Sequence, residues 1–226
     1  AKRMTAPRRP PVVIPAGGLY YDSIVFFSYL RRPGAGRICK QKGAFAMAHS
    51  EQTLDSRLIF DGKVIRVTLD TVRLENGDTS MREVVHHHGG ACIMPVTDQG
   101  EVYLVRQFRY ALGEEMWELP AGKLEAGEDP FEAAKRELEE ECGVTADEYI
   151  PLGCIYPTVG YDSEKIHIWI ARGLHATRQH LDEDEFLDVH KLPFDQVLQM
   201  VLDNTIRDSK TVAAVLRYAL MRGQGQ

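Results

Sequence analysis

The stretch of residues 117–144 constrains the fold most, because it combines clear helix boundaries with a cluster of acidic side chains. Asp129 can cap a helix, Pro130 suits the first helical position, and Gly143 is a natural stop. Glu132 falls in the first turn, where the helix dipole favours negative charge. The sequence therefore predicts a helix of about thirteen residues between Asp129 and Gly143.

Three acids of this predicted helix share one face. Glu137 and Glu141 are four residues apart and Glu140 is three from Glu137, so their carboxylates come close together and repel each other. Hard divalent cations such as Mg²⁺ prefer carboxylate and carbonyl oxygens and would relieve this repulsion. The plain alternative is a solvated surface helix whose acids pair with Lys135 and Arg136.

The spacing around the helix favours the metal interpretation. Gly122 is followed after five residues by Glu128 and after seven more by the run Arg136-Glu137-Leu138-Glu139-Glu140-Glu141-Cys142-Gly143-Val144. This run matches the Nudix box, Gx5Ex7REUxEExGU with U a bulky aliphatic residue, at every specified position. From about Leu58 to Met221 the chain resembles a Nudix hydrolase.

The resemblance implies a set of site residues. Glu137 and Glu141 would be the main metal ligands, joined by Glu140 and by the backbone carbonyl of Ala121, with Glu140 and Glu141 also taking part in catalysis. It further implies structural roles within the box, in which Arg136 orients glutamates, Glu128 braces the loop, and Gly122 and Gly143 meet backbone requirements. The implied cofactor is Mg²⁺, with Mn²⁺ as an alternative.

Residues outside the box resemble the ADP-ribose diphosphatase branch of this family. The shared segments are Gln107-Phe108-Arg109, Trp117-Glu118-Leu119-Pro120-Ala121-Gly122, and Asp208-Ser209-Lys210-Thr211. In this branch a glutamate in the loop after the box activates the water or binds a metal, and Glu164 stands at that place; a surface acid paired with Lys165 is the alternative. One departure concerns specificity, because Val159 stands where the branch usually has a proline.

Four residues are candidates for binding the substrate. Arg109 and Arg82 carry guanidinium groups that suit phosphate oxygens or a ribose, although both could simply be solvated residues at strand edges. Glu118 could bind a base or ribose edge, with a plain salt bridge as the alternative. Phe60 could stack on the base or pack in the core.

Strand patterns flank the box on both sides. Residues 64–74 and 82–85 predict a hairpin across Asn76-Gly77, and residues 91–96 and 102–108 predict a second pair of strands joined across Asp98-Gln99-Gly100. Residues 165–171 predict another strand, and residues 194–203 and 209–221 predict two amphipathic helices. With the resemblance, the expected fold is α/β, a Nudix α/β/α sandwich with a small N-terminal antiparallel β domain.

The first 46 residues differ in character from the rest of the chain. They carry nine basic residues against one acid, a net +8, whereas the chain as a whole carries −6. Residues 1–46 are therefore expected to be a non-native or disordered basic leader that precedes Met47; a targeting presequence and a nucleic-acid-binding tail are alternatives. The expected domains are then 47–88, the small β domain, and 89–226, the Nudix hydrolase domain.

The implied function is Mg²⁺-dependent hydrolysis of ADP-ribose to AMP and ribose 5-phosphate. Another nucleoside diphosphate sugar such as GDP-mannose, and a non-catalytic ADP-ribose-binding module, remain alternatives. Relatives in this branch form homodimers that exchange the small domain, so a homodimer is expected. No apolar run approaches the ~20 residues that cross a bilayer, so we expect a cytoplasmic protein that binds neither membrane nor nucleic acid.

The run His86-His87-His88 resembles a tag or a metal site at first sight. Adjacent residues on a strand point to opposite faces, so three in a row do not readily converge on one ion. We therefore do not expect a metal there.

Overall fold

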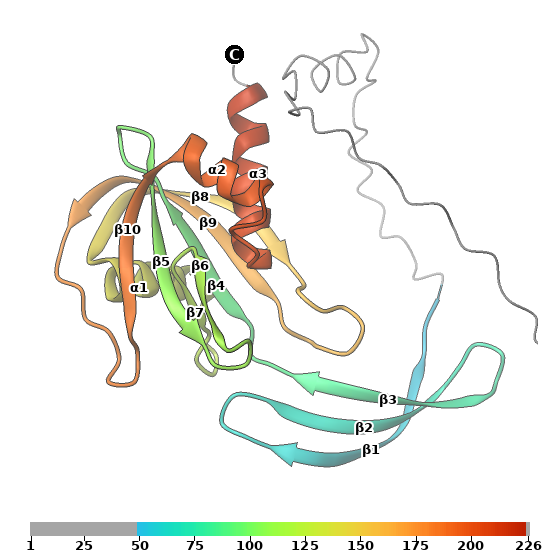
Figure 1. Ribbon diagram of the computed structural model, residues 1–226. Helices are drawn as coiled ribbons and strands as arrows, with labels where there is room; N and C mark the ends of the chain where they lie inside the picture. The colour runs from blue at the N-terminus through green and yellow to red at the C-terminus, as the bar shows by residue number, and fades with distance from the viewer. Residues whose placement is uncertain (1–48, 225–226) are drawn as a thin grey trace, which may run out of the picture. The chain divides into compact units, whose positions relative to one another are not determined.

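A computed structural model describes residues 49–224 of the chain, and the predicted basic leader lies outside this range. The first described unit of structure is a three-stranded antiparallel sheet, ordered β1-β2-β3 (Figure 1). Its strands are β1 (Gln52–Asp61), β2 (Arg66–Arg73) and β3 (Thr79–His86). The hairpin predicted around Asn76-Gly77 is confirmed as β2 and β3, and Gly77 has a positive φ of 90° in the turn.

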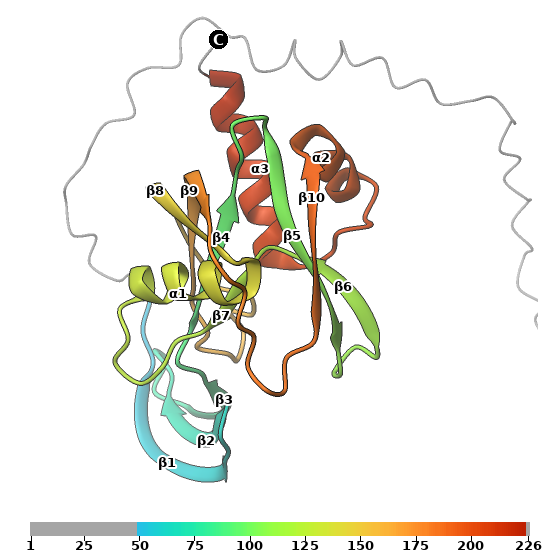
Figure 2. The same cartoon turned by 90° about the vertical axis from the view of Figure 1, so that its left-hand side faces the viewer.

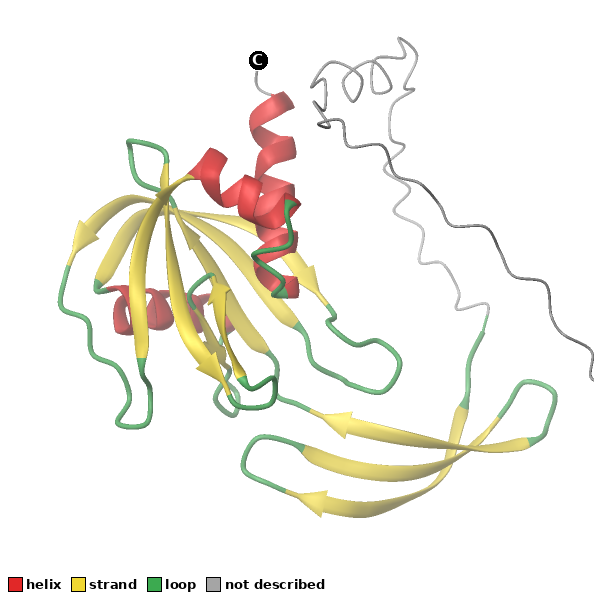
Figure 3. Ribbon diagram, in the orientation of Figure 1, coloured by secondary structure: helices red, strands yellow, loops and turns green. Residues whose placement is uncertain are grey.

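Two further sheets form the centre of the expected sandwich, and Figure 3 shows their strands in yellow between the red helices. One is ordered β10-β5-β6 and the other β7-β4-β9-β8. The strands are β4 (Gly90–Pro95), β5 (Glu101–Arg109), β6 (Glu114–Glu118), β7 (Ala121–Lys123), β8 (Val144–Ile155), β9 (Ile166–Ala176) and β10 (Leu187–Pro193).

Strand β4 lies at the centre of the sandwich and is buried along its whole length. Because side chains alternate along a strand, Ala91 and Ile93 pack in one core cluster and Cys92 and Met94 in another. The first cluster contains Leu138 of helix α1 (Pro130–Cys142), whereas the second contains residues of α2 (Phe194–Leu202) and α3 (Ser209–Gln224). Figure 2 shows α1 and α3 on opposite sides of β4, which gives the α/β/α layers.

Helix α1 has the predicted boundaries. Asp129 caps it by accepting hydrogen bonds from the backbone N–H groups of Phe131 and Glu132, and Pro130 opens it. Gly143 ends it in the left-handed conformation, with φ 63° and ψ 39°. The helices predicted at 194–203 and 209–221 are confirmed as α2 and α3.

The predicted pairing of residues 91–96 with 102–108 is wrong, although both strands exist. They belong to different sheets, and only an isolated bridge between Val96 and Val102 joins them across the turn. β4 instead pairs in parallel with β9, and β5 pairs with β6 and β10. Strand β4 is apolar on both faces, and this pattern favours a central position between two helical layers over a two-stranded hairpin.

The strand predicted at 165–171 is confirmed as β9, which runs five residues further, to Ala176. Within residues 49–224, none of the helices combines the length and the apolar character needed to span a bilayer.

Candidate active site

Gly122 and Glu137 meet at the start of the box in a contact that only glycine permits. A Cβ atom added to Gly122 would lie 1.8 Å from Oε1 of Glu137, far inside van der Waals contact. The Glu137 carboxylate therefore lies directly against the backbone of β7. Gly122 does not have a positive φ, so the backbone conformation does not require a glycine here. The requirement comes from the close approach of the Glu137 carboxylate, which leaves no room for a Cβ atom.

Glu141, one turn further along α1, is almost completely buried. Its Oε2 accepts a hydrogen bond of 3.0 Å from the backbone N–H of Ala121, and the residue is only 2% exposed. Burial raises the pKa of Glu141 to about 8, and the nearby charge of Glu137 adds to the rise. Residues 121 and 122 thus hold the two carboxylates from the same short strand.

Glu137 has a similar electrostatic environment. Burial raises its pKa to about 7, even though the guanidinium of Arg136 favours the charged form. Its side chain is 8% exposed. Two neighbouring buried carboxylates that both resist ionisation form a site that a positive ion would stabilise.

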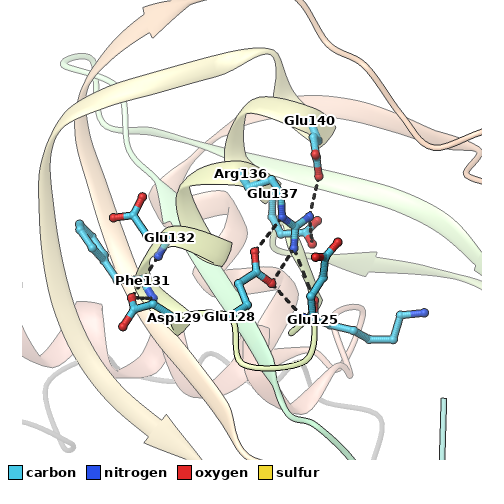
Figure 4. Close-up of polar contacts among 9 residues, drawn as sticks. Glu125, Glu128, Asp129, Phe131, Glu132, Arg136, Glu137 and Glu140 are labelled. Atoms are coloured by element: carbon cyan, nitrogen blue, oxygen red, sulfur yellow. Dashed lines mark hydrogen bonds and ion pairs between the residues drawn. The ribbon is translucent and has the colours of Figure 1, made fainter. Parts of the chain in front are cut away.

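Arg136 lies at the centre of the acids around the box helix, and Figure 4 shows its guanidinium between them. It donates hydrogen bonds to Oε1 of Glu137 at 2.8 Å and Oε2 of Glu140 at 2.7 Å. It also pairs with Glu128 at 3.0 Å, and Glu128 in turn accepts the backbone N–H of Glu125 at 2.9 Å. Arg136 therefore connects the loop before α1 with two acids of the helix.

The donor set suits a hard divalent cation. Glu137, Glu140 and Glu141 provide carboxylate oxygens on one face of α1, and the two buried ones are destabilised as anions where they stand. Among residues 49–224, no three acidic, histidine or cysteine side chains are already arranged as a cage. Arg136 instead holds Glu137 and Glu140, so a cation would compete with this guanidinium for their oxygens.

Arg109 and Lys210 form one ion cluster with the buried carboxylate of Glu118. The Arg109 guanidinium donates to both carboxylate oxygens of Glu118, at 2.5 and 2.6 Å, and Lys210 approaches the same carboxylate from α3. Burial would raise the pKa of Glu118, but its partners outweigh burial and lower it to about 2. The salt-bridge alternative for Glu118 is thus present in the structure, and it engages Arg109 as well.

The start of α3 also holds the loop before the box. The buried hydroxyl of Thr211 accepts the backbone N–H of Leu119 at 2.8 Å and donates to Asp208 at 2.6 Å. Leu119 lies two residues before Ala121, whose N–H binds Glu141. The segment Asp208-Ser209-Lys210-Thr211 therefore fixes the strand that supports the buried acids.

Glu164 lies in the loop between β8 and β9, and its side chain is 25% exposed. Its Oε1 is 3.7 Å from Nδ1 of His87, and its backbone N–H donates to Asp162 at 2.9 Å. In the same loop Val159 is 83% exposed. The alternative pairing of Glu164 with Lys165 is not among the ion pairs of the described residues.

Phe60 and Arg82 lie on the small sheet, away in sequence from the box. Phe60 is 54% exposed, which contradicts its core-packing alternative. Arg82 pairs with Glu51 through two hydrogen bonds. Neither residue belongs to an element that carries box residues.

Two parts of this arrangement were not anticipated from the sequence. The contact of His87 with the Glu164 loop links residues 76 positions apart, and no local pattern signals it. Lys210 and Thr211 stood in a segment typical of the family, but nothing in a helical pattern shows that they face Glu118 and Leu119.

Comparisons with known proteins agree with the box and the fold. The NUDIX domain model matches residues 86–215, and the model of the nucleoside diphosphate sugar hydrolase N-terminal domain matches residues 51–85. A methanol dehydrogenase activator of Bacillus methanolicus is 41% identical over 167 residues, covering 73% of this chain and 90% of that protein. An ADP-ribose pyrophosphatase of Bacillus subtilis (strain 168) is 40% identical with the same coverage.

A solved structure agrees at the level of the fold. The crystal structure of an ADP compounds hydrolase has a TM-score of 0.68 and 22% identity, covering 78% of this chain and 96% of that one. The family model and the two relatives confirm the family expected from the box spacing. The chain belongs to the Nudix hydrolase family, in the branch that carries a nucleoside diphosphate sugar hydrolase N-terminal domain.

Proposed function

We propose that the protein hydrolyses the pyrophosphate bond of ADP-ribose, giving AMP and ribose 5-phosphate, with Mg²⁺ as the cofactor and Mn²⁺ as a possible replacement. The observation that carries the proposal is the pair of buried carboxylates, Glu137 and Glu141, held against the backbone at residues 121 and 122. The relative named ADP-ribose pyrophosphatase, 40% identical over most of both chains, supports the choice of substrate.

In this proposal the metal is held by Glu137, Glu141 and Glu140 together with the backbone carbonyl of Ala121. When bound, a divalent cation neutralises charge on the phosphate oxygens and acidifies water. Arg136 orients Glu137 and Glu140 through its hydrogen bonds, and Glu128 fixes the guanidinium from the loop. Gly122 and Gly143 supply the close approach and the helix end.

Glu164 is proposed to act on the attacking water, either by accepting its proton or through a metal. Its partly exposed carboxylate lies in a loop beside the sandwich, where a substrate can reach it. A general base needs hydrogen-bond access to the proton that it removes, directly or through one water. Glu140 and Glu141 complete the proposed catalytic acids.

Substrate binding is assigned in the proposal to Arg109, Glu118, Arg82 and Phe60. Arg109 is 41% exposed in its side chain even while paired with Glu118, so part of the guanidinium remains open to a phosphate or ribose. Arg82 and Phe60 would contribute from the small domain, 47–88, to the hydrolase domain, 89–226, of a second copy in a homodimer. The exposed ring of Phe60 is available for stacking on a base.

Two other functions remain distinguishable alternatives. The first is hydrolysis of another nucleoside diphosphate sugar such as GDP-mannose, because Val159 departs from the branch in a loop that we place near the sugar. The second is a non-catalytic ADP-ribose-binding module. The unbroken set of box acids favours an enzyme over such a module.

The test is product analysis by chromatography with purified protein and Mg²⁺. The substrates are ADP-ribose, GDP-mannose, UDP-glucose, ADP-glucose and NADH, each at the same concentration. Fastest release of AMP from ADP-ribose supports the proposal. A faster reaction with another sugar nucleotide would identify that compound as the substrate instead of ADP-ribose. Binding of ADP-ribose without turnover in either Mg²⁺ or Mn²⁺ would identify the protein as a binding module and not an enzyme.

A further inference from the structure

The loop that carries Glu164 is paired with the end of the small sheet through backbone hydrogen bonds. The N–H of Val85 on β3 donates to the carbonyl of Tyr161 at 2.7 Å, and the N–H of Ser163 donates to the carbonyl of Val85 at 2.9 Å. Val85 and Asp162 form a parallel bridge. The loop is therefore attached to β3 in the manner of an added strand.

This pairing continues along the linker into the sandwich. The N–H of Gly90 donates to the carbonyl of Lys165 at 3.0 Å, and from there β4 and β9 pair in parallel. A Cβ atom at Gly89 would lie 2.7 Å from the same carbonyl, so the two backbones run very close together. Residues 161–165 are thus held along their length by residues 85–90.

His87 lies in the middle of this paired segment and faces the loop. Its backbone N–H donates to Oγ of Ser163 at 3.0 Å, and its Nδ1 accepts the N–H of Gly89 at 3.0 Å. The same Nδ1 is 3.7 Å from Oε1 of Glu164, and the imidazole is only 11% exposed. The ring therefore forms a wall beside the Glu164 carboxylate.

The other two histidines of the run have different environments. The ring of His86 is hydrogen-bonded to the hydroxyl of Thr68 at 2.9 Å, across the β2–β3 pair. His88 is exposed. Of these three residues, only His87 has a hydrogen bond or ion pair with the loop, which makes the exposed His88 a natural control position.

We propose that His87 and Ser163 are positioning residues for the loop that carries Glu164: the bond from the His87 N–H to Ser163 fixes the backbone beside Glu164, and the His87 ring limits where its carboxylate can lie. This inference rests on the proposed function in one respect, the role of Glu164 in hydrolysis. Displacing a reacting group by about 1 Å can cost roughly 10²-fold in rate. Loss of either positioning contact is therefore expected to lower turnover more than substrate binding.

The first experiment separates positioning from stability and binding. Ser163→Ala and His87→Ala are expected to lower kcat about ten-fold, part of the ~10²-fold cost of full misplacement, with KM close to wild type in both and Tm close to wild type in Ser163→Ala. Ser163 is exposed, so its replacement removes little packing. Ser163→Thr retains the hydroxyl and His87→Asn presents an oxygen near the place of Nδ1, so both should restore much of kcat, and His88→Asn should not change it.

The second experiment asks whether the two residues act through Glu164. In a Glu164→Gln background, His87→Ala should produce no further loss of kcat, because the group that it positions is gone. An additional ten-fold loss in that background would overturn the proposal. Wild-type kcat for Ser163→Ala and His87→Ala would overturn it as well.

A third measurement does not depend on turnover. Hydrogen exchange of the His87 amide should accelerate in Ser163→Ala and that of the Gly89 amide in His87→Ala, because each variant removes the side-chain acceptor of that amide, and neither should change in His88→Asn. If the wild-type enzyme hydrolyses no substrate, or if Glu164→Gln is fully active, the proposed function fails and the positioning role falls with it. Unchanged exchange in an active enzyme that depends on Glu164 would refute the positioning role alone.

Discussion

The box helix with its supporting strands and the three-stranded sheet differ in what determines their structure. Around α1, acids are buried against glycine and backbone, and β4 beneath them is buried at every position. On the small sheet, every residue of β1 is exposed, including Leu58, Ile59 and Phe60. The structure of the first region is determined by its own buried residues, whereas the second region buries few residues of its own.

The two regions therefore differ in the source of their stability. A small sheet with a solvated apolar face gains little from burial, and it needs a covering surface or a neighbour to be stable. One neighbour is already visible, because β3 pairs with the loop that carries Glu164. A second copy in the proposed homodimer would provide the covering surface.

Loss of one buried acid should have the largest effect on turnover among the variants considered. Glu137→Gln removes a proposed metal ligand, and we expect kcat to fall about 10³-fold, since metal stabilisation of the transition state is worth several kcal/mol. Tm without metal should be unchanged or higher, because a buried negative charge disappears. Steady-state kinetics and thermal melting of the same preparation test both parts. Near-normal turnover would exclude Glu137 from the mechanism.

A single methyl group in the well-packed region should also be costly. Gly122→Ala places a Cβ atom 1.8 Å from Oε1 of Glu137, so the carboxylate must move. We expect kcat to fall about 10²-fold from a displacement of this size. Gly223→Ala is the control, because its Cβ would meet nothing within 4 Å. Equal activities of the two variants would show that the position of Glu137 is not critical.

The buried acids should also make metal-free stability depend on pH. The pKa values of Glu137 and Glu141 are raised to about 7 and about 8, while unfolded glutamate titrates near pH 4.3. Between these values the unfolded chain binds fewer protons, so the free energy of unfolding should fall as pH rises from about 5 to about 8. Urea unfolding in EDTA measures this slope.

The matched variant isolates the contribution of the acids from the rest of the chain. In Glu137→Gln, the free energy of unfolding should fall less over the same pH range. In the wild-type protein at pH 8, added Mg²⁺ should reverse the loss of stability, because it binds the deprotonated carboxylates. A slope that is the same in wild type and Glu137→Gln would mean that the carboxylate is not destabilised by burial.

The exposed sheet should show the smallest effects. Phe60→Ala is expected to raise KM by roughly 2- to 13-fold, the equivalent of the ~0.5–1.5 kcal/mol of an aromatic stacking contact. Tm should change little, since the ring is 54% exposed. Phe60→Tyr preserves the ring and should preserve KM. A large drop in Tm for Phe60→Ala would show that a covering surface, and not the substrate, uses this ring.

Features with local causes were predicted well from the sequence. The ends of α1 follow from Asp129, Pro130 and Gly143, which act within a few residues of one another. The box spacing placed Glu137 and Glu141 together, because a helix brings positions four apart to one face. These interactions depend on neighbours along the chain, which the sequence displays directly.

Features with distant causes were not predicted. The turn residues after β4 suggested a hairpin with β5, but burial of both faces of β4 places it beside β9 instead. All residues of β1 are exposed, so burial does not alternate along this strand. The sequence therefore has no alternation of apolar and polar residues there from which the strand could be predicted. A salt bridge of Glu118 was one of the stated alternatives, but its partners Arg109 and Lys210 depend on contacts that only the folded chain creates.

Arg136 has a consequence for how this protein meets its metal. Its guanidinium lies among Glu128, Glu137 and Glu140, so the acidic face of α1 carries a built-in counter-charge. If the proposed metal ions bind Glu137 and Glu140, their binding would exchange one positive group for another. The selectivity of the site would then depend on competition with the Arg136 guanidinium as well as with water.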